Sequence, residues 1–280
     1  MDKSKIKSSI IILLAVVNVC LLALVFSDNT ETRKARLYRQ EALEAVFAEN
    51  GIAFDPATAI PDTAPPLMTL RRDVETEEKS FRALIGRASV EDQGGNVFFF
   101  LGTAGQAQSR GTGEFELMLL EADPIAAGKD AVSAAEAAMK KLGYECADIA
   151  PAVTWDSSST LVTLVCAQDG IPVRNARISF YFLAGRLQTI SGAGPLDKKI
   201  AASAAADYPD GITVLMKFLE LINQTGRVCG RVNGVGVEYV MSSAVSGSCT
   251  LRPVWHIEAD SGSFFIDAAT LKEENIEASA

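Results

Sequence analysis

The chain has 280 residues, enough for about two domains of ordinary size. With 48% hydrophobic and 22% charged residues, its composition excludes a disordered chain, a collagen-like fibre and a small protein held together by disulfides alone. The net charge of −9 disfavours a nucleic-acid-binding groove, because phosphate binding needs a clustered basic surface. The only histidine, His256, excludes a metal site built from several histidines.

An uncharged apolar segment occupies residues 8–27. As a helix, its ~20 residues would rise ~30 Å, the thickness of the hydrocarbon core of a bilayer. The preceding tail, residues 1–7, carries Lys3, Lys5 and Lys7, so the positive-inside rule places this tail in the cytoplasm and the body of the chain outside it. We therefore predict an uncleaved single-pass anchor in the cell membrane with an extracytoplasmic body.

Asn18 lies near the middle of this apolar segment. An amide that faces lipid is costly, whereas an amide that bonds to another helix stabilises the contact by ~0.6–2 kcal/mol. Asn18 is therefore a candidate for contact with a partner helix in the membrane. The alternative is that a single Asn is simply tolerated in a long apolar helix.

The first part of the body, residues 33–128, is predicted to be an α+β region. Residues 33–50 place apolar side chains at helical spacing on one face, namely Leu37, Leu43, Val46 and Phe47, and so indicate a helix that ends at Gly51. Four prolines between residues 56 and 66 then indicate an extended linker.

A charged helix over 74–85 and two strands, 96–101 and 114–120, follow this linker, with a glycine-rich loop between the strands. The second strand carries Glu114 and Glu116, so both carboxylates share one face, ~7 Å apart. This spacing suits acid/base catalysis, although a solvated strand face is the simpler interpretation.

The part of the chain after residue 129 contains an internal duplication. A shift of 83 residues matches three pairs of residues: Gly143 with Gly226, Cys146 with Cys229, and Cys166 with Cys249. We predict two duplicated units, residues 129–200 and 201–275, each with a helix followed by an antiparallel sheet. The fold class is therefore α+β, with one N-terminal transmembrane helix.

Four cysteines of the body are candidates for disulfides: Cys146, Cys166, Cys229 and Cys249. Disulfides persist outside the cytoplasm, and the repeat favours bonds between the first two and between the last two. Each bond would contribute ~3 kcal/mol if unstrained. The alternative is four buried free thiols. A zinc site is disfavoured, because no Cys-x-x-Cys spacing occurs.

Four segments together resemble the YycI/YycH class of membrane-anchored regulatory proteins: the anchor with its Asn, the helix ending in AVFAENGIAFD, residues 170–192 (GIPVRNARISFYFLAGRLQTISG) and residues 253–271 (PVWHIEADSGSFFIDAATL). The motifs G-x-P-V and P-x-W-x-I also resemble the broader PepSY-type α+β module. On their residues alone, the last two segments predict β-hairpins whose aromatic side chains lie in the core.

The resemblance implies a non-catalytic regulator of two-component signalling. Proteins of this class are expected to contact an envelope-sensing histidine kinase of Gram-positive bacteria and a sister anchored protein. Asn18 would make the helix contact, and the first external helix, Leu37 to Phe47, would couple it to the body. No cofactor or metal is expected. The four cysteines and the Ala-rich helix at 131–138 depart from the pattern of the class.

Two other functions are compatible with the residues. A PepSY-type inhibitory or binding module would act on a secreted peptidase or a cell-wall component through sheet edges or a groove. An enzyme could use the serines at 157–159 beside Asp156, with His256 as base, but a polar turn explains these serines equally well. No Gly-x-Ser-x-Gly, His-Glu-x-x-His or phosphate-binding glycine loop occurs, so we expect no catalysis.

Overall fold

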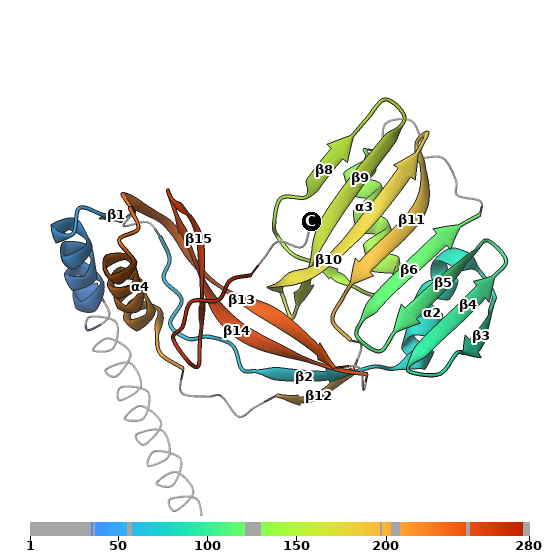
Figure 1. The fold of residues 1–280 in the computed structure, drawn as a ribbon, viewed down its shortest axis with the longest axis horizontal. Helices are drawn as coiled ribbons and strands as arrows, with labels where there is room; N and C mark the ends of the chain where they lie inside the picture. Colours follow the sequence, from blue (N-terminus) through green and yellow to red (C-terminus); the bar gives the residue numbers. More distant parts are fainter. Residues whose placement is uncertain are drawn as a thin grey trace, which may run out of the picture.

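The computed structural model describes residue 35 and residues 37–54, 58–120, 130–196, 198–202, 208–244 and 247–276. The predicted tail and membrane anchor, with Asn18, lie outside these residues. Within them, no helix has both the length and the apolar character needed to cross a membrane. The described chain is α+β, with four helices and a curled, mostly antiparallel sheet of fifteen strands (Figure 1).

One half of the sheet is built from two helix-plus-strand units that lie side by side (Figure 1). The first unit comprises α2 (Val74–Ile85), β3 (Ala88–Asp92), β4 (Val97–Gly102), β5 (Gly105–Arg110) and β6 (Glu114–Leu119). The second comprises α3 (Ala131–Lys141), β7 (Glu145–Cys146), β8 (Ala152–Trp155), β9 (Ser159–Gln168), β10 (Ile171–Leu183) and β11 (Arg186–Ala193). Antiparallel pairing of β6 with β11 joins the units, and both helices cover the same face.

The other half of the sheet comprises β1 (Ala53–Phe54), β2 (Met68–Arg71), β12 (Lys198–Ala202), β13 (Arg231–Ala244), β14 (Ser248–Ala259) and β15 (Gly262–Asp267). Helix α4 (Gly211–Thr225) packs on this half, and the first helix, 37–49, lies beside α4 (Figure 1). An ion pair of 2.7 Å between Arg39 and Asp210, the N-cap of α4, ties the two helices together.

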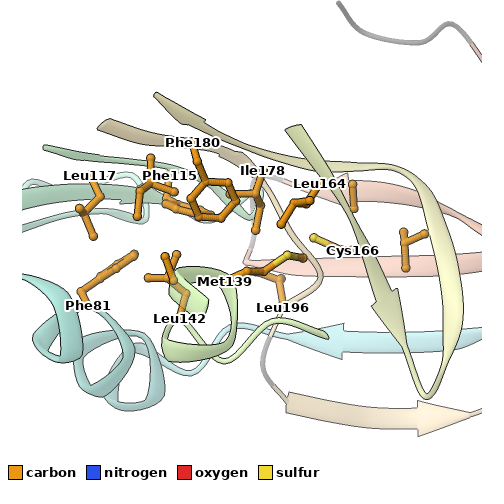
Figure 2. Packing of buried hydrophobic residues seen from close by; sticks show 14 of the residues in the cluster. Phe81, Phe115, Leu117, Met139, Leu142, Leu164, Cys166, Ile178, Phe180 and Leu196 are labelled. Atoms are coloured by element: carbon orange, nitrogen blue, oxygen red, sulfur yellow. The ribbon is translucent and has the colours of Figure 1, made fainter. Parts of the chain in front are cut away.

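The larger core lies between the sheet and the helices α2 and α3 (Figure 2). Ile178 and Phe180 of β10 are fully buried and point toward Met139 of α3 and Leu142, which caps the C-terminus of that helix. Each such side chain stabilises the fold by about 1.5–3 kcal/mol through burial. Because side chains alternate along a strand, Ser179, between the two buried residues, faces the opposite side of the sheet.

A second core lies between the first helix, α4 and the strands β13 to β15. Phe47 and Phe218 are completely buried there, and the ring of Phe218 meets that of Phe264 edge-on at 5.0 Å. The predicted apolar face of the first helix is thus confirmed at Phe47. Leu37, which the same periodicity placed on that face, is instead 58% exposed.

The predicted helix over 74–85 is confirmed as α2, and both predicted hairpins are confirmed as β10–β11 and β14–β15. The prediction of a glycine-rich loop between the strands at 96–101 and 114–120 is wrong, because this segment contains the strand β5. This strand is built from small and polar residues, which are poor β-formers in isolation. Close packing requires the glycines on either side of the turn between β4 and β5: a side chain at Gly102 of β4 would collide with the Ile85 carbonyl of α2, and one at Gly105 of β5 would collide with the Met118 carbonyl of β6 and press on the Ile85 side chain.

The order of elements expected for the two units occurs in both: α3 is followed by Cys146, β8, β9 with Cys166 and β10, and α4 is followed by Cys229, β13, β14 with Cys249 and β15. The 83-residue shift, however, does not superpose their strands. The turn between β9 and β10 falls at residues 169–170, and the 83-residue shift places its counterpart at 252–253, inside β14. The first strand after each cysteine differs in length between the units, since β8 has 4 residues and β13 has 14. The unit from α2 to β6, within the predicted N-terminal region 33–128, has the same order of a helix followed by antiparallel strands.

The two halves of the sheet meet where β10 passes β13. The register between β9 and β10 shifts between Val173 and Arg177, and Asn175 lies in this irregularity. The Asn175 Nδ2 donates to the Met241 carbonyl and its Oδ1 accepts from the Met241 N–H, both at 2.8 Å. The side-chain amide of Asn175 therefore makes the two hydrogen bonds to β13 that the backbone of a paired strand would make. Beside it, the Tyr239 hydroxyl donates to the Pro66 carbonyl at 3.0 Å.

We expect Asn175→Ala to lower the free energy of unfolding by about 2–4 kcal/mol, because it leaves the N–H and carbonyl of buried Met241 without partners. Urea unfolding of the full chain, followed by tryptophan fluorescence, measures the change. The control is Asn223→Ala, which removes only an exposed bond of 3.4 Å and should cost less than about 0.5 kcal/mol. Equal losses in the two variants would contradict this role of Asn175.

Candidate binding face on the sheet

The face of the sheet turned away from α2 and α3, called the outer face below, carries side chains in rows that cross the strands. Such rows arise because alternate residues of each strand share a face and neighbouring strands hold opposed residues in register. From β9 to β5 the strands stand in the order β9, β10, β11, β6 and β5. The pairing of these strands places two rows of different chemistry next to each other.

The polar row consists of Thr163, Ser179, Ser191, Glu116 and Gln108. The hydroxyls of Thr163 and Ser179 share a hydrogen bond of 2.9 Å. In the described part of the chain, the side chains of Ser191, Glu116 and Gln108 make no hydrogen bond or ion pair. The polar row therefore presents hydroxyl, carboxylate and amide groups that the fold leaves available.

The apolar row crosses the same strands two residues away from the polar row and continues onto β4. It consists of Leu161, Tyr181, Met118 and Leu101. Thr189 and Gln106 occupy the intervening strands. The four large side chains are between 37% and 53% exposed. They thus form a line of apolar groups in solvent, ~24 Å long at ~4.8 Å per strand.

A cleft of about 860 Å³ opens over the polar row and extends from β8 to β5. Its floor is formed by the small residues Ser191, Gly192 and Ala193 of β11. A side chain at Gly192 would collide with the carbonyl oxygen of Arg177 on the neighbouring strand, so close packing of the strands requires glycine there. The volume lies within the range of ~300–1,000 Å³ that is usual for small-ligand sites.

Charged side chains of both signs line this cleft. Arg110 and Glu114 form an ion pair of 3.3 Å with each other, and both are more than half exposed, so the pair adds little to stability. Arg177 on β10 has no ion-pair or hydrogen-bond partner among the described residues, and its Nε is shielded from solvent. Glu116 on β6 is likewise unpaired within them.

The predicted acid/base pair, Glu114 and Glu116, does lie on one face of β6, as its alternating burial shows. Both residues line the cleft. The sequence contained no signal for Arg177 or for the small floor of β11, because their shared position depends on which strands become neighbours.

The serines at 157–159, Asp156 and His256 do not come together as a catalytic site. Asp156 accepts hydrogen bonds from the backbone N–H groups of Ser158 and Ser159 at 2.9 and 2.8 Å, and these bonds lower the pKa of its carboxyl group. Asp156 therefore caps a turn. His256 lies on β14, in the other half of the sheet, where its Nδ1 is 2.9 Å from Glu238 Oε1.

The environment of His256 is largely closed. Its ring stacks on the ring of Phe265, with 4.7 Å between the two centroids. The guanidinium of Arg174 also lies over the Phe265 ring, 5.1 Å from its centroid. Arg174 also approaches Glu238 at 3.8 Å. The Nε2 of His256 is buried and has no hydrogen-bond partner in the described residues. His256 thus serves to join β14 to its neighbours.

The cysteines fall into two different situations, and all four are free thiols in this structure. Cys146 of β7 lies directly opposite Cys166 of β9, as the predicted bond between them requires. Cys229 precedes β13, whereas Cys249 of β14 lies opposite Ser243 near the far end of β13, so most of this 14-residue strand separates the two cysteines. Their predicted pairing is wrong.

Among the residues that the structure describes, no group of three or more His, Cys, Asp and Glu side chains is arranged to hold a metal ion.

We expect mild oxidation of the full chain to link Cys146 to Cys166 and to leave Cys229 and Cys249 unlinked. Burial raises the pKa of both opposed thiols, and Glu136 raises that of Cys146 further. The thiolate is therefore scarce at neutral pH, and the rate should rise about tenfold per pH unit from pH 7 to 9. Peptide mapping by mass spectrometry after treatment with oxidised glutathione measures the link.

The bond would raise the free energy of unfolding by ~3 kcal/mol, because it closes a loop of roughly 20 residues in the unfolded chain. Cys249→Ser is the matched control and should leave the link intact, whereas Cys166→Ser should abolish it. A link between Cys229 and Cys249 would contradict the strand register.

No protein-family model matches the chain, and no curated protein matches it. Among solved structures, the chain is similar to the crystal structure of an uncharacterized protein from Eubacterium rectale ATCC 33656. The TM-score is 0.48 and the sequence identity is 9%, over 81% of this chain and 90% of that one.

Proposed function

We propose that this chain is a non-catalytic regulatory protein that acts on an envelope-sensing histidine kinase through protein–protein contacts. In this proposal residues 8–27 anchor the chain in the cell membrane, and Asn18 contacts a helix of the kinase or of a sister anchored protein. The outer face of the extracytoplasmic body provides the second contact. The apolar row on this face is the observation that carries the proposal.

The apolar row has the properties of a contact surface. The large side chains of Leu161 and Tyr181 stand in solvent directly opposite one another, and contiguous exposed apolar groups usually mark an interaction site. Tyr and Met are also enriched at protein interfaces. Burial against a partner would release about 25 cal/mol for each Å² of apolar surface removed from water. The adjacent polar row supplies hydrogen-bonding groups at the rim.

The contacts of the candidate catalytic groups support a function without catalysis. His256 is bound to Glu238, Asp156 caps a turn, and Glu114 is paired with Arg110. His256, Asp156 and Glu114 thus have structural partners, whereas Glu116 has none among the described residues.

A second candidate is an inhibitory or binding module for a secreted peptidase or a cell-wall component. The edge of the sheet at β8 favours it, because β8 pairs only with β9 among the described strands. Trp155 at the end of β8 is 74% exposed. An extended peptide from a partner could add to such an edge as a further strand.

We expect Tyr181→Glu to weaken capture of the kinase about tenfold, because it places a charge in the centre of the apolar row. The measurement is affinity purification of the full-length protein from native membranes after mild crosslinking, with the captured proteins quantified by mass spectrometry. Val228→Glu is the matched control, since Val228 is 86% exposed and lies outside the sheet. Equal capture by the two variants would exclude the outer face as the contact.

The same purification tests the membrane contact through Asn18→Leu, which keeps the segment apolar and removes its amide. We expect this variant to reduce recovery of the kinase or of the sister protein several-fold. Recovery of secreted enzymes or wall material alone would overturn the regulatory proposal and favour the inhibitory or binding module.

A further inference from the structure

The cleft over the polar row contains two opposite charges that the described fold leaves unpaired. Arg177 lines it from β10 and Glu116 lines it from β6. The Nε of Arg177 is buried without a hydrogen-bond partner. A buried guanidinium N–H without a hydrogen-bond partner lowers the stability of the fold, because its contact with water is not replaced. The cleft therefore contains a donor and a charge that no group of the described fold satisfies.

The spacing of these charges follows from the sheet. One strand, β11, separates β10 from β6, and Glu116 is in register with Ser179, two residues after Arg177 on β10, so the backbones at Arg177 and Glu116 lie about 12 Å apart along a diagonal. The residues between them on β11, Ser191 to Ala193, are small and form the floor. The two charges therefore face the same open space across a low floor and do not neutralise each other.

We propose that this cleft binds a short peptide with free ends, its carboxylate on Arg177 and its ammonium group on Glu116. An extended peptide of three or four residues spans ~10–14 Å, which matches the separation of the two charges. The hydroxyls of Ser179 and Ser191 and the amide of Gln108 lie between or beside them, where they can bond to the backbone groups of the peptide.

A dipolar peptide fits this site better than a neutral glycan or a purely anionic ligand. A neutral glycan would leave both charges uncompensated, and a purely anionic ligand would meet the carboxylates of Glu114 and Glu116. The aromatic residue of the lining, Phe115, is 6% exposed and stacks on Tyr144 at 5.7 Å in the core. Its ring is therefore not presented to a sugar.

This inference deepens the proposed function and rests on it for its regulatory meaning. Leu161 lines the cleft and also belongs to the apolar row. A peptide in the cleft would therefore change the surface that the kinase contacts.

Calorimetric titration of the full chain in lipid nanodiscs tests the site. The probe is a pool of tetrapeptides of random sequence with free ends, compared with the same pool amidated at the carboxyl end or acetylated at the amino end. We expect either modification to weaken binding at least tenfold. Arg177→Gln should remove the effect of amidation, and Glu116→Gln should remove the effect of acetylation.

Matched controls are Arg87→Gln and Glu91→Gln, which make the same charge changes at exposed positions outside the cleft. Both should bind as the unmodified chain does, and the thermal midpoint of every variant checks folding. Absence of saturable binding at millimolar peptide, or equal affinity for free and amidated pools, would overturn the inference.

The outcomes separate this site from the kinase contact. Kinase capture without peptide binding overturns the peptide site alone. Peptide binding without kinase capture overturns the regulatory function alone.

Discussion

The side-chain amide of Asn175 is the contact on which the arrangement of the sheet depends. Its two hydrogen bonds to Met241 continue the sheet from β10 to β13, at a point where the backbone of β10 is irregular. A side chain without both a donor and an acceptor could not make this connection. The interaction therefore joins the two halves of the sheet beside the larger core, which continues from β10 to Tyr239 and Met241 of β13.

The same irregularity sets the direction of the residues that follow it. After the register shift, Arg177, Ser179 and Tyr181 face outward, whereas Ile178 and Phe180 face the helices. One strand thus contributes to the cleft, the polar row and the apolar row on one side, and to the main core on the other. Stability and the proposed binding surface are built from alternate residues of β10.

Small residues recur wherever two backbones come close. Gly102 at the end of β4 leaves room for Ile85 of α2, Gly105 at the start of β5 leaves room for the carbonyl of Met118, and Gly192 leaves room for the carbonyl of Arg177. The first two positions flank the turn into β5, a strand that lacks the usual β-forming residues. The third lies in the lining of the cleft. In both places the local sequence departs from the usual pattern of a strand because a tertiary contact requires it.

The sequence by itself determined the α+β class, the helix at 74–85, both hairpins and the shared face of Glu114 and Glu116, because periodicity and turn residues act over a few residues. It also brought Cys146 opposite Cys166 within one short unit.

Only the tertiary structure decided which strands became neighbours. The pairing of β6 with β11 brings Glu116 near Arg177, although 60 positions separate them in the chain. The length of β13 separates Cys229 from Cys249. Both outcomes depend on strand pairing between distant segments, where the entropy of closing long loops is offset by cooperative burial and not by any local preference.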